Sequence, residues 1–183
     1  MSSNDLRVVK TLKHIEDVFW EISREKPLRK ITVTELCQKA QISKGTFYRY
    51  YTDPYDLYSK LMKGHAETFF NSVDYFDLYF KDPHEFMRRF RADSERDMAQ
   101  HNYPRIESEY EDSFNTYWLQ LFIQKILEAA PEEIREKPLT QRQLLELQMI
   151  LYCDLKSFRV WPDRKEETEE VISSWIDRLF QEI

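Results

Sequence analysis

Glycine, cysteine and histidine are scarce in this chain, whose 183 residues include only two glycines, two cysteines and four histidines. Tight hairpin turns depend on glycine, so its scarcity argues against a sheet-rich fold. Cys37 and Cys153 lie far apart, each has apolar residues nearby in the sequence, and neither shows CxxC or histidine spacing. We therefore expect buried reduced thiols rather than a disulfide or a zinc site, and no other metal or cofactor.

Long apolar runs are also missing. The longest stretch without a charge, residues 113–124, is too short to span a bilayer. The first twenty residues carry charges of both signs and contain no apolar secretory core. These absences predict a cytoplasmic protein with no membrane partner.

Catalytic signatures are missing as well. The sequence contains no GxSxG, HExxH, P-loop or dinucleotide-binding pattern. The four histidines, His14, His65, His84 and His101, show no ligand spacing. An enzyme is therefore not expected.

What the chain does have is charge and well-spaced proline. Charged residues make up 33% of the sequence, against an average of about 25%, and such a composition favours long solvent-facing helices. Seven prolines divide the chain into helix-length pieces. The sequence thus predicts an all-α fold of about nine helices.

The charge is unevenly distributed. Residues 1–65 contain twelve lysines and arginines against eight aspartates and glutamates, a net charge of +4 within a chain whose total is −6. The remaining residues therefore carry −10. Because the local field near phosphates matters more than the total charge, a basic first third is compatible with a nucleic-acid partner.

Residues 32–51 carry two helix signatures with a short turn between them. Thr32 and Glu35 match a capping box, and Ser43 can cap a second helix that spans residues 44–51. An apolar stripe in residues 5–25 can cover both helices. The spacing therefore predicts a helix-turn-helix, whose inward-facing positions are Leu36, Cys37, Ala40, Phe47 and Tyr51.

Gly45 lies at the second position of the second helix, where glycine costs roughly 1 kcal/mol relative to alanine. A glycine there suggests that another molecule comes close, and duplex DNA fits. Lys44 and Thr46 could donate to phosphates or bases, and Tyr48 could pack on the sugar-phosphate wall. The alternative is an ordinary helical hairpin with a solvated surface.

The segment SKGTFYRYY, residues 43–51, followed by a helix cap at Asp53, resembles the DNA-binding region of the tetracycline-repressor (TetR/AcrR) family over about residues 6–65. Two positions depart from the family pattern: Gln41 stands where a turn glycine is usual, and Pro54 where many relatives have a phosphate-binding lysine. With Ser43 at the cap, the resemblance implies a DNA-binding set of Thr34, Ser43, Lys44, Gly45, Thr46, Tyr48, Arg49 and Tyr50.

The second half of the chain is rich in aromatic residues, which would line either a packed core or an apolar cavity. If a cavity forms, rings with polar tips could orient a small-molecule effector. Three arginines in residues 84–100, Arg88, Arg89 and Arg91, are expected on a solvent-facing side, either salt-bridged or available to an anionic effector. The predicted effector pocket comprises Tyr110, Phe114, Tyr117, Trp118 and Tyr152.

Each of the last two long helices, residues 140–160 and 164–183, has two apolar stripes. One stripe from each can close the domain while the other packs on a second copy across a two-fold axis. Two DNA-binding helices related by that axis would recognise a pseudo-palindromic operator in double-stranded DNA, with half-sites roughly 34 Å apart. The predicted homodimer interface comprises Leu145, Met149, Tyr152, Trp175 and Leu179.

These features together predict an N-terminal helix-turn-helix DNA-binding domain, residues 1–52, and a C-terminal helical domain for effector binding and dimerisation, residues 53–183. The expected function is ligand-responsive transcriptional repression. The competing interpretation is a helical co-regulator or adaptor that acts mainly through a protein partner, with weak or no direct DNA binding. Pro54 and the acidic second half keep that interpretation open.

Overall fold

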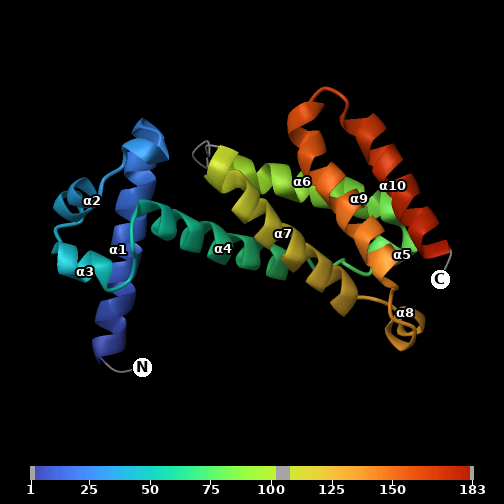
Figure 1. Ribbon diagram of the computed structural model, residues 1–183, viewed down its shortest axis with the longest axis horizontal. Coiled ribbons are helices and arrows are strands. Elements are labelled where there is room, and N and C mark those ends of the chain that lie inside the picture. Colours follow the sequence, from blue (N-terminus) through green and yellow to red (C-terminus); the bar gives the residue numbers. More distant parts are fainter. Residues whose placement is uncertain (1–2, 102–107, 182–183) are drawn as a thin grey trace. The chain divides into compact units, whose positions relative to one another are not determined.

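The computed structural model describes residues 3–101 and 108–181, and within them every regular element is a helix (Figure 1). These residues form ten α-helices, against about nine predicted, together with one short 3-10 turn, η1 (Leu28–Lys30). The prediction of an all-α fold is confirmed. The helices are α1 (Ser3–Glu25), α2 (Val33–Lys39), α3 (Lys44–Tyr48), α4 (Pro54–Ser72), α5 (Leu78–Lys81), α6 (Pro83–His101), α7 (Ser108–Glu128), α8 (Glu132–Glu136), α9 (Gln141–Val160) and α10 (Lys165–Gln181).

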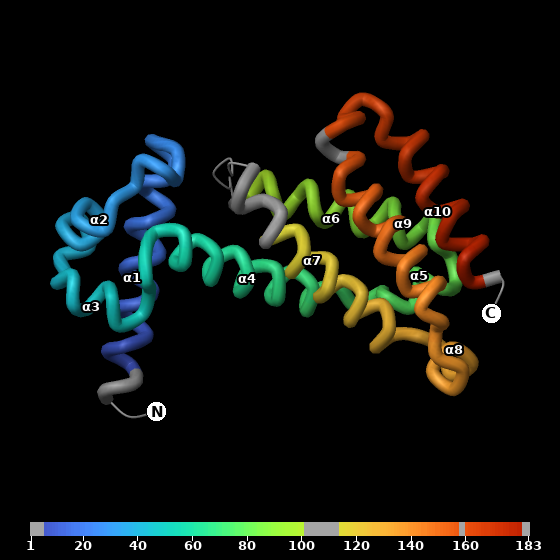
Figure 2. Tube along the Cα trace, in the orientation of Figure 1, coloured from blue at the N-terminus to red at the C-terminus, as the bar shows by residue number. Residues whose placement is uncertain are grey.

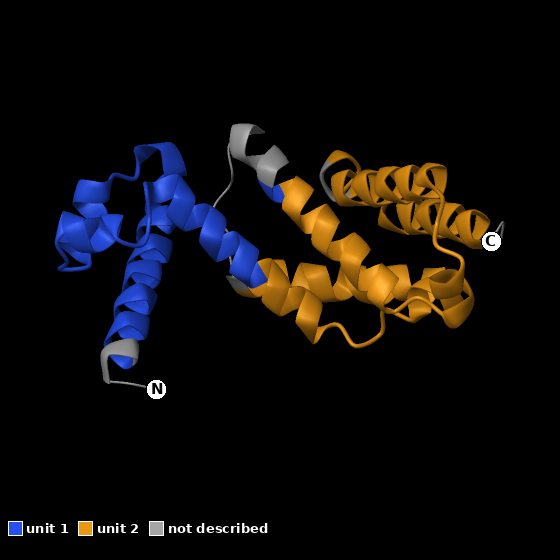
Figure 3. Ribbon diagram, turned by 60° about the horizontal axis from the view of Figure 1, so that its bottom comes forward, with its two compact units in different colours: residues 1–65, 103–114 blue, residues 66–102, 115–183 orange. Residues whose placement is uncertain are grey.

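The chain forms two compact units, coloured blue and orange in Figure 3. Unit 1 comprises residues 1–65 and 103–114, and unit 2 comprises residues 66–102 and 115–183. The first part of α4 therefore belongs with the N-terminal helices, beyond the predicted domain boundary at residue 52. The reason is apolar packing, since Leu57, Tyr58 and Met62 are buried in the core of unit 1.

The core of unit 1 follows from the helical spacing of its apolar residues. Ile15, Phe19 and Ile22 recur at intervals of three and four, so they share one face of α1, and all three are buried. The short helices α2 and α3 follow one another along the chain beside α1 (Figure 2). Their buried residues in this core are Leu36, Cys37, Ala40, Phe47 and Tyr51, the five positions predicted to face inward.

Unit 2 is built around a cluster of aromatic rings from α4, α6 and α7. The rings of Phe90 and Phe122 stack with centroids 4.6 Å apart, and Trp118 lies 5.0 Å from Phe122 and 4.9 Å from Phe70. Phe70, Phe90 and Phe122 are almost fully buried. Of the two arrangements that the aromatic residues allowed, these rings adopt the packed core.

A buried charge cluster ties three helices of unit 2 together. Arg91 of α6 is only 1% exposed. Its Nη2 donates to Asp154 Oδ1 (2.7 Å) and Ser157 Oγ (2.9 Å) of α9, and its Nη1 donates to Thr168 Oγ1 (2.7 Å) of α10. The guanidinium thus holds α9 and α10 on α6.

The prediction of three solvent-facing arginines is therefore wrong for Arg91. Arg88 and Arg89 are exposed and pair with Glu85 one turn earlier. Arg91 instead follows the fully buried Met87 by four residues, which places both side chains on the inward face of α6. Within the part of the chain that is described, no helix combines the length and apolar character needed to cross a membrane.

Candidate functional site

The turn between α2 and α3 begins from a capped helix. The N–H of Glu35 donates to Thr32 Oγ1 at 3.2 Å, which is the first half of the predicted capping box. Both carboxylate oxygens of Glu35 instead accept from Lys26 Nζ. The reciprocal half of the box is thus replaced by an ion pair that ties α2 to the end of α1.

Gln41 makes the turn possible by adopting a left-handed backbone with φ of 52°. The N–H of Ile42 donates to the carbonyl of Cys37 (3.0 Å) and that of Gln41 to the carbonyl of Gln38 (3.3 Å). This pair of bonds is a Schellman ending, which usually places glycine at the left-handed position. The glutamine at this position therefore preserves the turn, as expected, but with a backbone that glycine would adopt at lower cost.

Helix α3 is shorter than predicted. Ser43 caps it, because its Oγ accepts from the N–H of Thr46 at 3.0 Å. The helix ends at Tyr48 rather than continuing to Tyr51. The N–H groups of Tyr50 and Tyr51 both donate to the carbonyl of Phe47 (3.0 Å each), so the chain tightens into a turn after little more than one helical turn.

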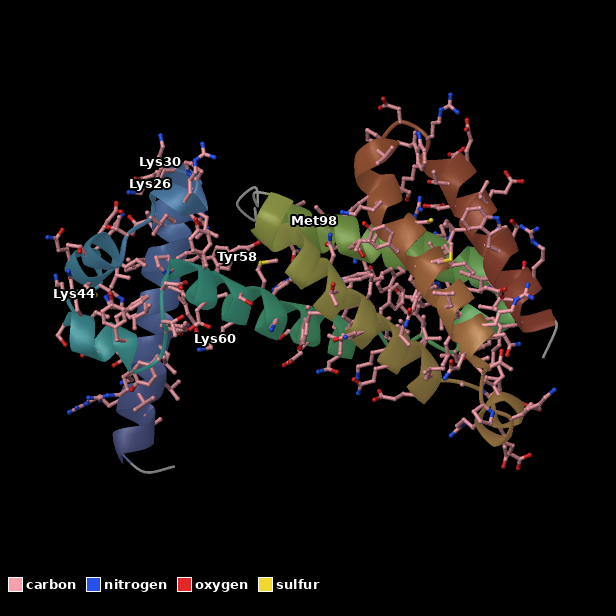
Figure 4. All side chains as sticks on the ribbon, viewed as in Figure 1. Lys26, Lys30, Lys44, Tyr58, Lys60 and Met98 are labelled. Carbon is pink, nitrogen blue, oxygen red and sulfur yellow. The ribbon has the colours of Figure 1, made fainter. Side chains whose placement is uncertain are left out.

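The predicted DNA-binding residues gather on the outer side of α3, apart from Thr34 on α2. Phe47 and Tyr51 face the core, whereas Tyr48 is 55% exposed. Thr46 and Tyr50 are half-buried. Figure 4 labels Lys44 at α3 and Lys30 just beyond the end of α1. The remaining predicted residues, Thr34, Ser43, Lys44, Gly45 and Arg49, are exposed.

Gly45 has no packing reason to be glycine. A Cβ added there would meet only Ser43 Oγ, at an ordinary contact distance of 3.7 Å. Its backbone is not left-handed either, since no described glycine has a positive φ. The fold of unit 1 would therefore accept alanine at this position.

The start of α4 offers few free donors. The Asp53 carboxylate accepts the N–H groups of Tyr55 and Asp56 (2.8 Å each), and Asp56 Oδ2 accepts the N–H of Thr52 (2.9 Å). Pro54 has no N–H to give. Backbone groups here are taken by carboxylates, so they do not replace the phosphate-binding lysine that the resemblance implied.

Two residues that the sequence did not single out, Lys60 and Glu16, hold the segment that follows α3. Lys60 of α4 donates to the carbonyl of Tyr50, and Tyr51 donates its hydroxyl to Glu16 of α1. Burial and the nearby Glu16 carboxylate raise the pKa of Tyr51 to about 12, so the phenol stays protonated. The spacing of Lys60 from Asp56, i and i+4, was a readable signal. The contact between Lys60 and Tyr50, which are ten residues apart, could not be predicted from the spacing of the sequence.

The rings predicted to line an effector pocket are dispersed. Phe114 packs against the core of unit 1, Trp118 lies in the aromatic core of unit 2, and Tyr152 is exposed on α9. Tyr117 donates to Glu67 and borders an open, mostly polar groove of about 380 Å³. The side chain of Tyr110 lies outside the described residues. The four described rings therefore lie in different surroundings, and the effector pocket stays a prediction.

The predicted dimer residues lie along α9 and α10, and most are exposed. Leu145, Met149 and Tyr152 are 56%, 60% and 45% exposed, and Trp175 is 36% exposed. Leu179 is instead 6% exposed, although it borders the same groove as Met149 and Trp175. We call Leu145, Met149, Tyr152 and Trp175 the apolar face of unit 2.

Cys153 borders a groove of about 430 Å³ beside Met149 and Trp175. Cys37 is buried, as predicted, but Cys153 is exposed, so the expectation of a second buried thiol is wrong. Leu151, two residues earlier, is only 1% exposed, so apolar neighbours in the sequence do not show which face of α9 Cys153 occupies.

No protein-family model, curated protein or solved structure matches this chain. Among the residues that the structure describes, no three His, Cys, Asp or Glu side chains are grouped to hold a metal ion. The candidate binding surfaces are therefore the polar outer side of α3 in unit 1 and the apolar face of unit 2.

Proposed function

We propose that this protein is a homodimeric transcriptional regulator, a repressor, that binds a specific sequence of double-stranded DNA. In this proposal α2, the turn at Gln41 and α3 act as a helix-turn-helix, and α3 enters the major groove. The resemblance of residues 43–51 to the tetracycline-repressor family supports it, as does the net charge of +4 on residues 1–65.

The observation that carries the proposal is Gly45. It is exposed, its added Cβ would meet only Ser43 Oγ at 3.7 Å, and glycine weakens a helix by up to about 1 kcal/mol. A partner that approaches the backbone of α3 closely accounts for its presence. The neighbouring Lys44 and Arg49 supply cations, and the exposed ring of Tyr48 supplies a surface that can pack on a sugar-phosphate wall.

The proposed dimer pairs the apolar face of unit 2 with the same face of a second copy. An exposed face of four large apolar side chains on two adjacent helices suits an isologous four-helix contact. Two copies of α3 would then recognise half-sites about 34 Å apart, or a multiple of that distance. A small-molecule effector that prefers the non-binding dimer by about 5.5 kcal/mol would release the DNA.

The test compares two glycines that carry the same substitution. Duplexes that bind the wild-type protein are first selected from random sequence, and affinity is measured by fluorescence anisotropy at several salt concentrations. We expect wild-type affinity to fall steeply between about 50 and 200 mM salt. Gly45→Ala should weaken binding by at least about tenfold, because its methyl group would stand between α3 and DNA.

Gly64→Ala is the matched control, since a Cβ there would meet nothing within 4 Å and the residue lies on α4. We expect unchanged DNA affinity for this variant. Both variants should keep wild-type helicity by far-UV circular dichroism. Retained affinity in Gly45→Ala would remove the close-approach argument, and the absence of any salt-dependent DNA binding by the wild-type protein would reject the proposal.

The alternative is a co-regulator that works mainly through a protein partner. One observation favours it: Asp53 and Asp56 place two carboxylates at the start of α4, where they accept backbone N–H groups and oppose a phosphate. A selection from random sequence that yields no duplex bound by the folded wild-type protein, even at low salt, would support this alternative.

A further inference from the structure

Helix α3 is too short to hold its own orientation. It spans five residues, Lys44–Tyr48, and isolated helices of that length are unstable in water. Its direction must therefore be set by the buried ring of Phe47 and by what holds its two ends. Ser43 caps the first end locally. The second end is held by contacts with α1 and α4.

Besides the apolar core that Phe47 and Tyr51 share with Leu57 and Tyr58, the ammonium group of Lys60 makes a polar contact with α4. Lys60 Nζ donates to the carbonyl of Tyr50 (2.9 Å) and to Asp56 Oδ2 (3.0 Å), and it lies 5.4 Å from the ring centroid of Tyr51. A cation is favourable here, because a helix carries partial negative charge where its carbonyls end. The same group satisfies the carbonyl of Tyr50, which lies two residues beyond the end of α3.

Asp56 extends this contact to the segment that joins the two helices. Its Oδ2 accepts both from Lys60 and from the N–H of Thr52 (2.9 Å). Partial burial acts to raise the pKa of Asp56, but the Thr52 N–H and Lys60 outweigh it and hold the pKa below its usual value. The carboxylate is thus ionised at neutral pH, and Lys60, Asp56, Tyr50 and Thr52 form one connected brace.

We infer that Lys60 is a positioning residue for DNA recognition. It fixes the orientation of α3 relative to α4 and does not itself contact DNA. This inference rests on the proposed function of α3. Its donors are already directed at Tyr50 and Asp56, both within unit 1. A cation used in this way affects binding through the orientation of Lys44, Tyr48 and Arg49 rather than through a phosphate contact.

The experiment separates these two roles by salt dependence. Lys60→Met removes the ammonium but keeps a linear apolar stem, and Lys60→Arg keeps a donor and a charge. We expect Lys60→Met to weaken binding of the selected duplex by about tenfold with an unchanged slope of log affinity against log salt. Lys60→Arg should restore most of the affinity.

Two further lysine variants calibrate the slope. Lys44→Met should flatten it by about one unit, as expected for a direct phosphate contact. Lys63→Met removes the same charge three residues further along α4 and should change neither affinity nor slope. If Lys60→Met flattens the slope as Lys44→Met does, Lys60 is a phosphate contact and the inference is overturned. Unchanged affinity in Lys60→Met overturns it too.

A measurement without DNA keeps the inference separate from the proposed function. The N–H of Thr52 is bound to Asp56, which Lys60 holds in place. Hydrogen exchange at Thr52 should therefore become faster in Lys60→Met and remain slow in Lys63→Met. If the wild-type protein binds no DNA, the proposed function fails, and this exchange still reports whether the brace holds. Equal exchange in the two variants rejects the brace itself.

Discussion

The two units use their charged residues in opposite ways. Unit 1 exposes Lys44 and Arg49 on the outer side of α3, beside a glycine that its own packing does not require. Unit 2 instead buries Arg91 at 1% exposure and surrounds it with acceptors from α9 and α10. The partners of Arg91 within unit 2 account for its position in the fold. The exposed Lys44 and Arg49, beside a glycine that the fold does not require, suggest instead that another molecule binds to α3.

The charged residues of the two units therefore differ in role. In unit 2, burial of a guanidinium requires good geometry, because desolvating two ions opposes their attraction. In unit 1, exposing the polar side chains around α3 costs little free energy, and these side chains contribute little to the stability of the fold. Substitutions at the charged residues of unit 2 should therefore act on folding, whereas those on the outer side of α3 should act on binding.

The largest effect is expected at Asp154. Asp154→Ala leaves Arg91 buried without its nearest carboxylate, since Glu169 Oε1 lies 3.9 Å from Nη1, and it should lower the free energy of unfolding by about 3–5 kcal/mol. Urea denaturation measures this loss. Arg88→Ala is the control, since it breaks a solvent-screened, exposed ion pair on the same helix as Arg91 and should leave the free energy of unfolding almost unchanged.

A double variant sharpens this prediction. Arg91→Met combined with Asp154→Leu replaces the ion pair by apolar side chains of similar volume, and stability should recover most of the loss. If Asp154→Ala costs no more than Arg88→Ala, the buried cluster does not stabilise unit 2, and the contrast between the units disappears.

Much of unit 1 could be predicted because its signals are local. Ser43 caps the N–H of Thr46 three residues later, and Phe47 and Tyr51 share a face because they are four residues apart. The contact between Arg91 and Asp154 joins residues 63 positions apart, so no local spacing reveals it. The sequence thus identified the outer side of α3 but not the charge cluster of unit 2.

Periodicity also could not tell which neighbour covers an apolar face. It marked Trp118 and Tyr152 equally as rings of a possible pocket, yet Trp118 packs against Phe122 while Tyr152 is exposed. The same ambiguity made Cys153 look buried. Which stripe faces the core depends on how α7, α9 and α10 pack together, and that information is spread over the whole chain.

The next largest effect is expected at the apolar face of unit 2. Met149 and Met98 are both 60% exposed, but only Met149 lies on that face. Met149→Glu would place two charges in the proposed contact between copies, so the dimer dissociation constant should rise by about 100-fold, or about 2.7 kcal/mol. Sedimentation equilibrium measures the change.

Met98→Glu should leave the dimer intact, since it makes the same substitution on α6. A thiol-reactive bifunctional reagent gives a second readout, because the exposed Cys153 borders the same face. Cross-linking of the wild-type dimer through Cys153 should be lost in Met149→Glu. If both methionine variants dissociate equally, or neither does, this face is not the dimer interface.

The smallest effect is expected at Gln41, where the turn carries a backbone conformation that L side chains rarely adopt. A left-handed backbone at a non-glycine residue costs about 1–2 kcal/mol, and glycine removes this strain. Part of the stability gained is lost again, because glycine gives the unfolded chain more conformational freedom. Gln41→Gly should therefore raise the free energy of unfolding by about 0.5–1 kcal/mol, measured by urea denaturation.

The same substitution three residues earlier should have the opposite sign. Gln38 lies inside α2 with ordinary helical geometry, so Gln38→Gly should lower the free energy of unfolding by up to about 1 kcal/mol. Because Gln41 lies in the turn and not on the outer side of α3, Gln41→Gly should leave DNA affinity unchanged while stability rises. A gain in stability that comes with a loss of affinity would mean that the turn itself takes part in binding, and that unit 1 does not separate folding from recognition.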